Sequence, residues 1–144
     1  MTNHTNDANT LPDIVQTQLM NAPIEKVWKA VATAEGLSAW FMPNNLEAAV
    51  GREFTIEGGP WGQSPCKVTE VDPPNRLAFN WGKDWTLAFE LKTAGEGQTE
   101  VTIIHSGWTA DSVTEFGEAH SLVRERMNGG WGKLKFALQK HVEA

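Results

Sequence analysis

Hydrophobic and polar residues follow one period in the middle of the chain and another on either side of it. Residues 14–20 alternate imperfectly and predict a first strand. Residues 24–33 carry hydrophobic side chains at helical spacing and follow Asn21, which we expect to cap this helix. Gly36 is expected to end the helix, and residues 37–41 are expected to add one further turn.

Between Leu46 and Ser106 the period is two, with breaks that are rich in glycine and proline. The breaks separate about six short strands and leave too little chain for helices between them. We therefore expect an antiparallel meander with one covered face. The residues expected on that face are Phe54, Ile56, Leu77, Phe79, Trp81, Trp85, Leu87, Phe89, Leu91, Val101, Ile103 and His105.

Helical spacing returns after an irregular stretch at 108–114 and continues to about Glu143. One narrow stripe of this helix carries Phe116, His120, Val123, Met127, Trp131, Leu134 and Leu138. A helix of roughly 24 residues is ~36 Å long, so it can cross a small domain and cover the apolar face of the sheet. Gly129 and Gly130 each cost about 1 kcal/mol in its middle. Their missing side chains allow either close approach to the sheet or space for a guest.

These elements predict an α+β fold, in which a curved antiparallel sheet wraps around a long C-terminal helix. Short helices follow the first strand, and the inward residues enclose a hydrophobic cavity. Residues 1–12 are expected to form a flexible leader, and residues 13–144 a single domain.

Composition narrows the function classes. The net charge of -6 argues against a nucleic-acid surface, which would need clustered Lys and Arg. Cys66 is the one cysteine, so no disulfide within the chain and no all-cysteine zinc site can form. No signal peptide and no span of ~20 apolar residues is visible. We therefore expect a cytoplasmic monomer without membrane association, metal or cofactor, and seven tryptophans remain to be explained.

Four segments form a specific combination. They read Ala-Pro-Ile-Glu-Lys-Val-Trp at 22–28, Gly-Leu-Ser-Ala-Trp-Phe at 36–41, Glu-Val-Asp-Pro-Pro-Asn-Arg-Leu at 70–77 and Ile-His-Ser-Gly-Trp at 104–108. Together they resemble the START-like (Bet v 1-like, SRPBCC) superfamily and, within it, the activator of heat-shock protein 90 ATPase homologue-like family. Segments 64–68 and 124–131 make the chain similar to the bacterial YndB-type subgroup. The resemblance implies a helix-grip fold that holds a hydrophobic small molecule between the sheet and the long helix.

The candidate ligand contacts are the large side chains of the inward faces and of the loops beside them. They are Trp40, Phe41, Phe54, Trp61, Phe79, Trp81, Trp85, His105, Trp108, Phe116, His120, Met127, Trp131 and Leu134. For the rings on strands, ordinary core packing is an equal alternative, because pockets and cores are both apolar. For the rings in loops, the alternatives are a lid over the cavity and an anchor for the loop.

The polar candidates have structural alternatives too. For His105 we favour a core histidine bonded to a backbone carbonyl over ligand contact or catalysis. His120 can supply a polar contact at one end of the cavity, but no carboxylate at a motif spacing completes a triad. Arg124 is expected to pair with Glu70 or Glu90 rather than with an acidic ligand.

We therefore expect a non-catalytic protein that binds or transports a hydrophobic, ring-containing small molecule. The resemblance implies lipids, sterol-like compounds and aromatic polyketide or flavonoid-like molecules as candidates. Stacked and edge-on rings contribute about 0.5–1.5 kcal/mol per pair beyond burial, which favours planar guests. One alternative is a polyketide cyclase or hydrolase-like enzyme with His105 or His120 as general acid or base. A co-chaperone that binds a heat-shock ATPase in the stress response is less favoured, because the family name describes a longer protein with an additional domain.

Overall fold

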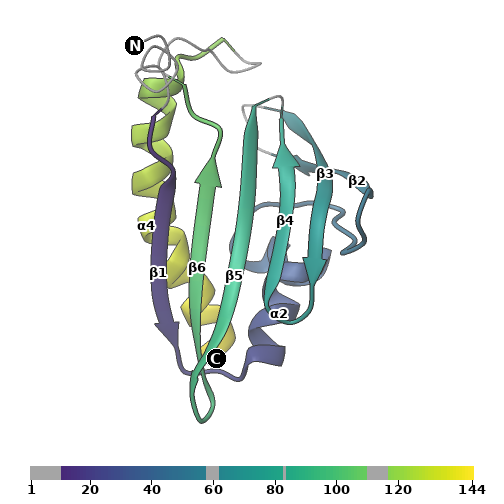
Figure 1. Cartoon of the computed structure of the whole chain (residues 1–144), viewed down its shortest axis with the longest axis vertical. Coiled ribbons are helices and arrows are strands. Elements are labelled where there is room, and N and C mark those ends of the chain that lie inside the picture. Colours follow the sequence, from purple (N-terminus) through teal and green to yellow (C-terminus); the bar gives the residue numbers. More distant parts are fainter. Residues whose placement is uncertain (1–10, 58–61, 83, 110–116) are drawn as a thin grey trace, which may run out of the picture.

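The computed structural model describes residues 11–57, 62–82, 84–109 and 117–144. A six-stranded antiparallel sheet has the order β1-β6-β5-β4-β3-β2, and the helices lie on one of its faces (Figure 1). The strands are β1 (Ile14–Met20), β2 (Glu53–Glu57), β3 (Gln63–Asp72), β4 (Arg76–Trp81), β5 (Trp85–Gly95) and β6 (Gln98–Ser106). The helices are α2 (Ile24–Ala32), α3 (Ala34–Trp40) and α4 (His120–Glu143). The helix-grip fold is confirmed.

The strands from β2 to β6 form the predicted meander, and β1 joins its far end. Ile14 lies opposite His105, so β1 pairs with β6, the last strand in the sequence. Between residues 46 and 106 the described chain forms five strands rather than about six. Glu47 makes only an isolated bridge to Thr33, and this pair does not continue into a strand.

Helix α2 ends within one residue of the predicted boundary, but Gly36 is not what ends it. Helix α2 ends at Ala32, and Thr33 is extended, with φ -126° and ψ 150°. The Thr33 hydroxyl accepts a hydrogen bond from the backbone N–H of Gly36 at 3.0 Å and thereby caps α3. A Cβ built on Gly36 would lie 2.1 Å from the carbonyl oxygen of Lys29. Gly36 therefore does not end the first helix but allows α3 to pack closely against it.

Asn21 does not cap α2. The helix starts after Pro23 without a side-chain cap. The backbone N–H of Asn21 instead donates to Glu143 Oε2 at 2.8 Å, and its side-chain oxygen accepts from Gln98 Nε2 at 2.8 Å. The first of these bonds, followed by one from Gln139, lowers the pKa of Glu143. Asn21 thus joins the end of β1 to the end of α4 and to the β5–β6 hairpin.

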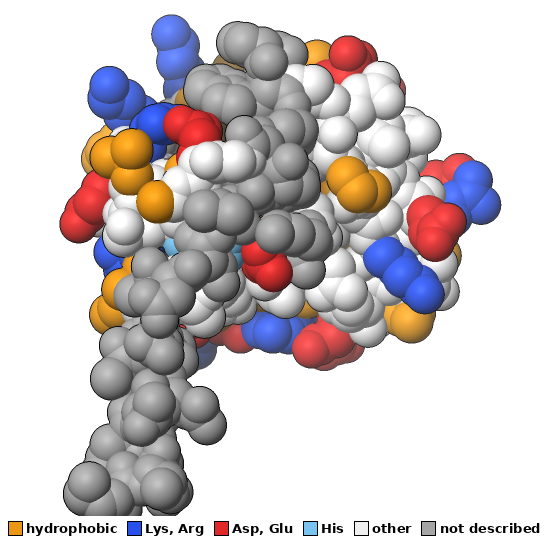
Figure 2. All heavy atoms as spheres, turned by 90° about the horizontal axis from the view of Figure 1, so that it is seen from above, with side chains coloured by type: hydrophobic (Ala, Val, Ile, Leu, Met, Phe, Trp, Pro, Cys, Tyr) orange, Lys and Arg blue, Asp and Glu red, His pale blue; other side chains and the backbone are white. Residues whose placement is uncertain are grey.

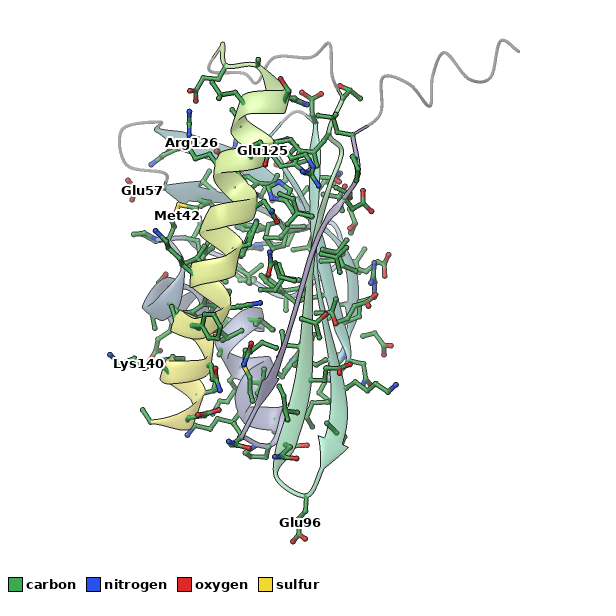
Figure 3. All side chains as sticks on the ribbon, turned by 90° about the vertical axis from the view of Figure 1, so that its left-hand side faces the viewer. Met42, Glu57, Glu96, Glu125, Arg126 and Lys140 are labelled. Carbon is green, nitrogen blue, oxygen red and sulfur yellow. The ribbon has the colours of Figure 1, made fainter. Side chains whose placement is uncertain are left out.

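Helix α4 has the predicted length and covers the sheet. Its 24 residues run behind β1 and β6 (Figure 1). Side chains fill the space between the helices and the sheet (Figure 3). Lys140 points away from the sheet on the outer side of α4 (Figure 3). A Cβ on Gly129 or Gly130 would meet nothing within 4 Å, so close approach to the sheet does not explain these glycines.

The apolar face of the sheet is buried as predicted. Leu77, Phe79, Leu87, Phe89 and Ile103 are each 0% exposed, and they form the centre of the core. Hydrophobic side chains on the surface form separate patches between charged ones when the molecule is seen from above (Figure 2). None of the described helices is both long enough and apolar enough to span a bilayer.

Candidate functional site

Aromatic rings from four strands, two helices and two connections form one connected set between the sheet and α4. We call this set the aromatic layer. Each ring centroid lies 4.6–6.5 Å from that of at least one other member. Its members are Trp40, Phe41, Phe54, Phe79, Trp81, Trp85, Phe89, His105, Trp108, His120 and Trp131.

Strand register brings three nitrogen-containing rings, those of Trp81, Trp85 and His105, to one end of the sheet. Trp81 lies opposite Trp85 where β4 turns into β5. His105 lies opposite Leu87, diagonally from Trp85 on the same face of the sheet. Alternation along each strand places the three rings on the same face of the sheet, and the register brings them together.

His105 is fully buried among tryptophans. Its ring stacks on Trp81 with centroids 5.2 Å apart and meets Trp85 edge to face at 4.9 Å. Trp108 lies 4.6 Å away and Trp131, from α4, 6.1 Å away. The histidine therefore connects the sheet to the long helix within the aromatic layer.

The hydrogen bonds of His105 fix its protonation. Trp131 Nε1 donates to His105 Nδ1 at 3.0 Å, and Trp108 Nε1 donates to the His105 backbone carbonyl at 2.9 Å. The buried position is confirmed, but the side-chain partner is an indole N–H rather than the expected carbonyl. Because Nδ1 accepts, the neutral ring carries its proton on Nε2. Burial, followed by the charge of His120, lowers the pKa of His105 to about 3, so the ring is neutral at physiological pH.

Three ring nitrogens in this corner have no hydrogen-bond partner within the described part of the chain. They are Nε1 of Trp81, Nε1 of Trp85 and Nε2 of His105. The centroids of the three rings lie 4.9–5.3 Å apart. Leaving a buried donor unpaired costs about 1–3 kcal/mol, so three together are a large cost for a packed core.

His120, the first residue of α4, lies beside a carboxylate. Its Nδ1 accepts a hydrogen bond from the backbone N–H of Thr109 at 3.2 Å. Its Nε2 lies 3.2 Å from Asp84 Oδ2, within ion-pair distance but without hydrogen-bond alignment. The turn between β4 and β5 thus supplies a carboxylate for His120 that spacing along the sequence did not reveal.

The remaining predicted residues divide by burial. Trp40 donates from Nε1 to the Ala30 carbonyl at 2.8 Å. Trp40 and Trp108 are buried at 6% and 1% exposure, so both are anchors rather than parts of an open lid. Phe41, Met127 and Leu134 are half-buried and pack against the core. Trp61 and Phe116 lie outside the described residues.

Sequence reasoning missed two members of the site and misplaced one arginine. Phe89 was placed on the covered face but not among the ligand contacts, and Asp84 was not singled out. Arg124 donates from Nε to the Pro12 carbonyl at 2.7 Å rather than pairing with a strand carboxylate. Glu70 and Glu90 both pair with Arg76, which lies beside them on the sheet.

Two hollows lie on other parts of the structure. One of about 480 Å³ is bordered by β2, β3 and β4 and lined by Phe54, Cys66 and their neighbours. Another of about 430 Å³ lies between α2, α3 and the end of α4, with Lys26 and Lys29 in its wall. Among the described residues, Phe54 is the one predicted ligand contact that lines either hollow. The part of the chain that the structure describes contains no cluster of three or more potential metal ligands.

Three solved structures show similarity over most of the chain. BH1534 from Bacillus halodurans is 44% identical, with a TM-score of 0.83, over 93% of this chain and 99% of that one. CalU16 from Micromonospora echinospora is 20% identical, with a TM-score of 0.70, over 92% of this chain and 80% of that one. An HSP90 activator from Plasmodium falciparum, PFC0360w, is 21% identical, with a TM-score of 0.69, over 84% of this chain and 88% of that one. The last two similarities show the shared fold.

The family assignment follows from the match along the sequence. Curated proteins give no significant match. Residues 21–143, however, match the family described as Activator of Hsp90 ATPase homolog 1-like protein. The resemblance found in the four sequence segments is thereby confirmed. The chain belongs to the Activator of Hsp90 ATPase homolog 1-like family, within the SRPBCC (Bet v 1-like) superfamily.

Proposed function

We propose that the protein binds or transports a planar, hydrophobic small molecule against the aromatic layer between the sheet and α4. The observation that carries this proposal is the continuity of the layer across separate elements. Phe41 stacks on Trp131 with centroids 5.2 Å apart and an interplanar angle of 22°. Trp81 stacks in the same manner on His105. A planar guest gains offset or edge-on contacts with such rings, each worth about 0.5–1.5 kcal/mol beyond burial.

Side chains at the edge of the aromatic layer suit a variable guest. Met127 and Leu134 on α4 are half-buried, and methionine adapts its shape to irregular neighbours. Ring-containing lipids, sterol-like compounds and aromatic polyketide or flavonoid-like molecules are the candidate ligands. We also propose that the chain lies close to the YndB-type subgroup, on the basis of segments 64–68 and 124–131.

Ligand titration tests the binding proposal. Flavone, a sterol and a fatty acid are each added to the protein while tryptophan emission is followed. We expect saturable responses to the ring compounds and weaker ones to the acyl chain. The Met127→Trp variant should reduce affinity at least tenfold by filling the edge of the layer, which corresponds to about 1.4 kcal/mol.

Leu122→Trp is the matched control, because Leu122 is 60% exposed on α4 and the change adds the same fluorophore. Circular dichroism checks that both variants are folded. The absence of a saturable response across the whole panel would refute the proposal, and so would equal affinities of the two variants.

A second candidate function is a cyclase or hydrolase-like activity. The 3.2 Å contact between His120 Nε2 and Asp84 Oδ2 favours it, because a carboxylate can orient a histidine that acts as acid or base. His105 is the alternative acid or base, but its lowered pKa makes it a poor proton donor at neutral pH. The test is turnover of polyketide and ester substrates by the wild type and by His120→Gln. Turnover that disappears in the variant while ligand binding persists would support catalysis, and unchanged turnover would exclude this role for His120.

Binding to a heat-shock ATPase is the third candidate, favoured by the family match. Purified chaperone is mixed with the protein, and both complex formation and ATP hydrolysis are measured. Neither a complex nor a change in hydrolysis rate at tens of micromolar protein would exclude it.

We also propose a cytoplasmic monomer that takes no metal or cofactor. Light scattering coupled to gel filtration measures the mass against the 15.9 kDa expected of one chain. Elemental analysis of the purified protein tests whether it contains a metal, and native mass spectrometry tests whether it contains a cofactor.

A further inference from the structure

We propose that Trp81, Trp85 and His105 together bind a carbonyl oxygen of the ligand. We call the three unpaired ring nitrogens of these residues the donor cluster. This inference rests on the proposed function and specifies its ligand as a planar ring system conjugated to a carbonyl group.

A count of donors and acceptors supports the donor cluster. Three indole N–H groups, those of Trp81, Trp85 and Trp131, lie around one imidazole that contributes one N–H and one acceptor nitrogen. Trp131 occupies the acceptor at 3.0 Å. The other three N–H groups have no acceptor in the described part of the chain.

Rearrangement among these rings cannot remove the excess of donors. If His105 moved its proton to Nδ1, the Trp131 N–H would lose its acceptor, and at least three donors would stay unpaired even if Nε2 then accepted from Trp81 or Trp85. Ring rotations change which donor is unpaired but add no acceptor. An acceptor from outside these four rings is therefore needed to pair the remaining donors.

The burial of the cluster indicates what that acceptor is. His105 is 0% exposed and Trp81 4%, and Trp85 is half-buried with its Nε1 covered, so an acceptor here must give up its water shell. A neutral carbonyl loses less hydration than a carboxylate, and both of its lone pairs can accept.

The surroundings of the cluster favour a carbonyl that is attached to a ring. Trp85 contacts Trp108 with ring centroids 4.7 Å apart, and Trp81 contacts Phe41 at 5.7 Å. A planar molecule lying against these rings can direct an oxygen from its edge toward the donor cluster. Aryl ketones, quinones and flavone-like chromones share this chemistry.

Two probes of nearly the same shape test the inference. Fluorene and 9-fluorenone share one tricyclic frame, and only the second has a carbonyl. Calorimetric titration of the wild type should show 9-fluorenone binding at least tenfold more tightly than fluorene. Trp81→Phe and Trp85→Phe each keep an aromatic ring but lack the N–H, and each should reduce this preference at least threefold.

Trp28→Phe is the matched control, because Trp28 is a half-buried residue of α2 outside the aromatic layer. It should keep the full preference for the ketone. A second measurement uses the wild type alone and does not depend on how the variants fold. It follows the indole ¹⁵N–¹H signals during titration. Those of Trp81 and Trp85 should move downfield with 9-fluorenone and not with fluorene.

The outcomes separate the two proposals. Equal affinities for the two probes, with unmoved indole signals, would overturn the donor cluster while leaving the binding of planar molecules intact. No binding of either probe would overturn this inference, and together with no saturable response to flavone, the sterol or the fatty acid it would overturn the proposed function as well. A preference for the ketone that survives both substitutions would also overturn the inference.

Discussion

Burial of His105 makes the folded protein sensitive to acid. Its pKa falls from 6.5 to about 3 on folding, chiefly because burial disfavours the charged ring. Between these values the unfolded chain binds a proton that the folded chain does not. The stabilising contribution is therefore fully present above pH 6.5 and is lost as the pH falls toward 3. At pH 4.5, two pH units below the unfolded pKa, the loss is about 3 kcal/mol.

Urea unfolding, followed by tryptophan emission at pH 7.5 and 4.5, measures this loss. The His105→Asn variant removes the titrating group but keeps an acceptor oxygen for the Trp131 N–H. We expect this variant to be less stable at both pH values through lost packing. The difference in unfolding free energy between the two pH values should nevertheless be smaller by about 2–3 kcal/mol than in the wild type.

His141→Gln is the control, because His141 is exposed near the end of α4. It should leave the pH dependence close to that of the wild type. If His105→Asn retained the full acid sensitivity, the reasoning that His105 is buried in its neutral form would be refuted.

Three further substitutions probe the fold. Gly129→Ala should stabilise α4 by about 1 kcal/mol, because the added methyl group meets nothing within 4 Å; a melting temperature unchanged or lowered in calorimetry would contradict this. Gly107→Ala should cost at least about 2 kcal/mol in urea unfolding, since φ is +97° and the new Cβ would lie 2.1 Å from the Asp84 carbonyl oxygen. Trp131→Phe should cost roughly 2–3 kcal/mol by removing the hydrogen bond to His105, and a loss below 0.5 kcal/mol would show that this bond contributes little.

The parts of the fold that were predictable depend on periodicity. Alternation placed Phe79, Phe89 and Ile103 on one face, and burial of one face of an antiparallel sheet requires that pattern. The bounds of β1 and the length of α4 followed for the same reason. The end of α2 followed within one residue, but the start of α3 at Ala34 did not, because the bridge of Thr33 to Glu47 and its cap on α3 have no periodic signal.

The site was predictable as a set of rings but not as a set of contacts. Spacing placed Trp81, His105 and Trp131 on faces that meet. Which nitrogen of His105 accepts, and from which indole, depends on how α4 lies across the sheet. The contact of His120 with Asp84 likewise joins two segments whose spacing along the chain matches no known motif.

The pairing of β1 with β6 sets the order in which the chain can assemble. Ile14 must find His105, so the contact spans most of the sequence, whereas β2 to β5 are joined by neighbouring hairpins. Closing so long a loop is entropically costly and slows folding. On the ribosome, β1 is made first but lacks its partner until β6 has emerged. The hairpins from β2 onward can form meanwhile, so we expect the first strand to close the sheet late in folding.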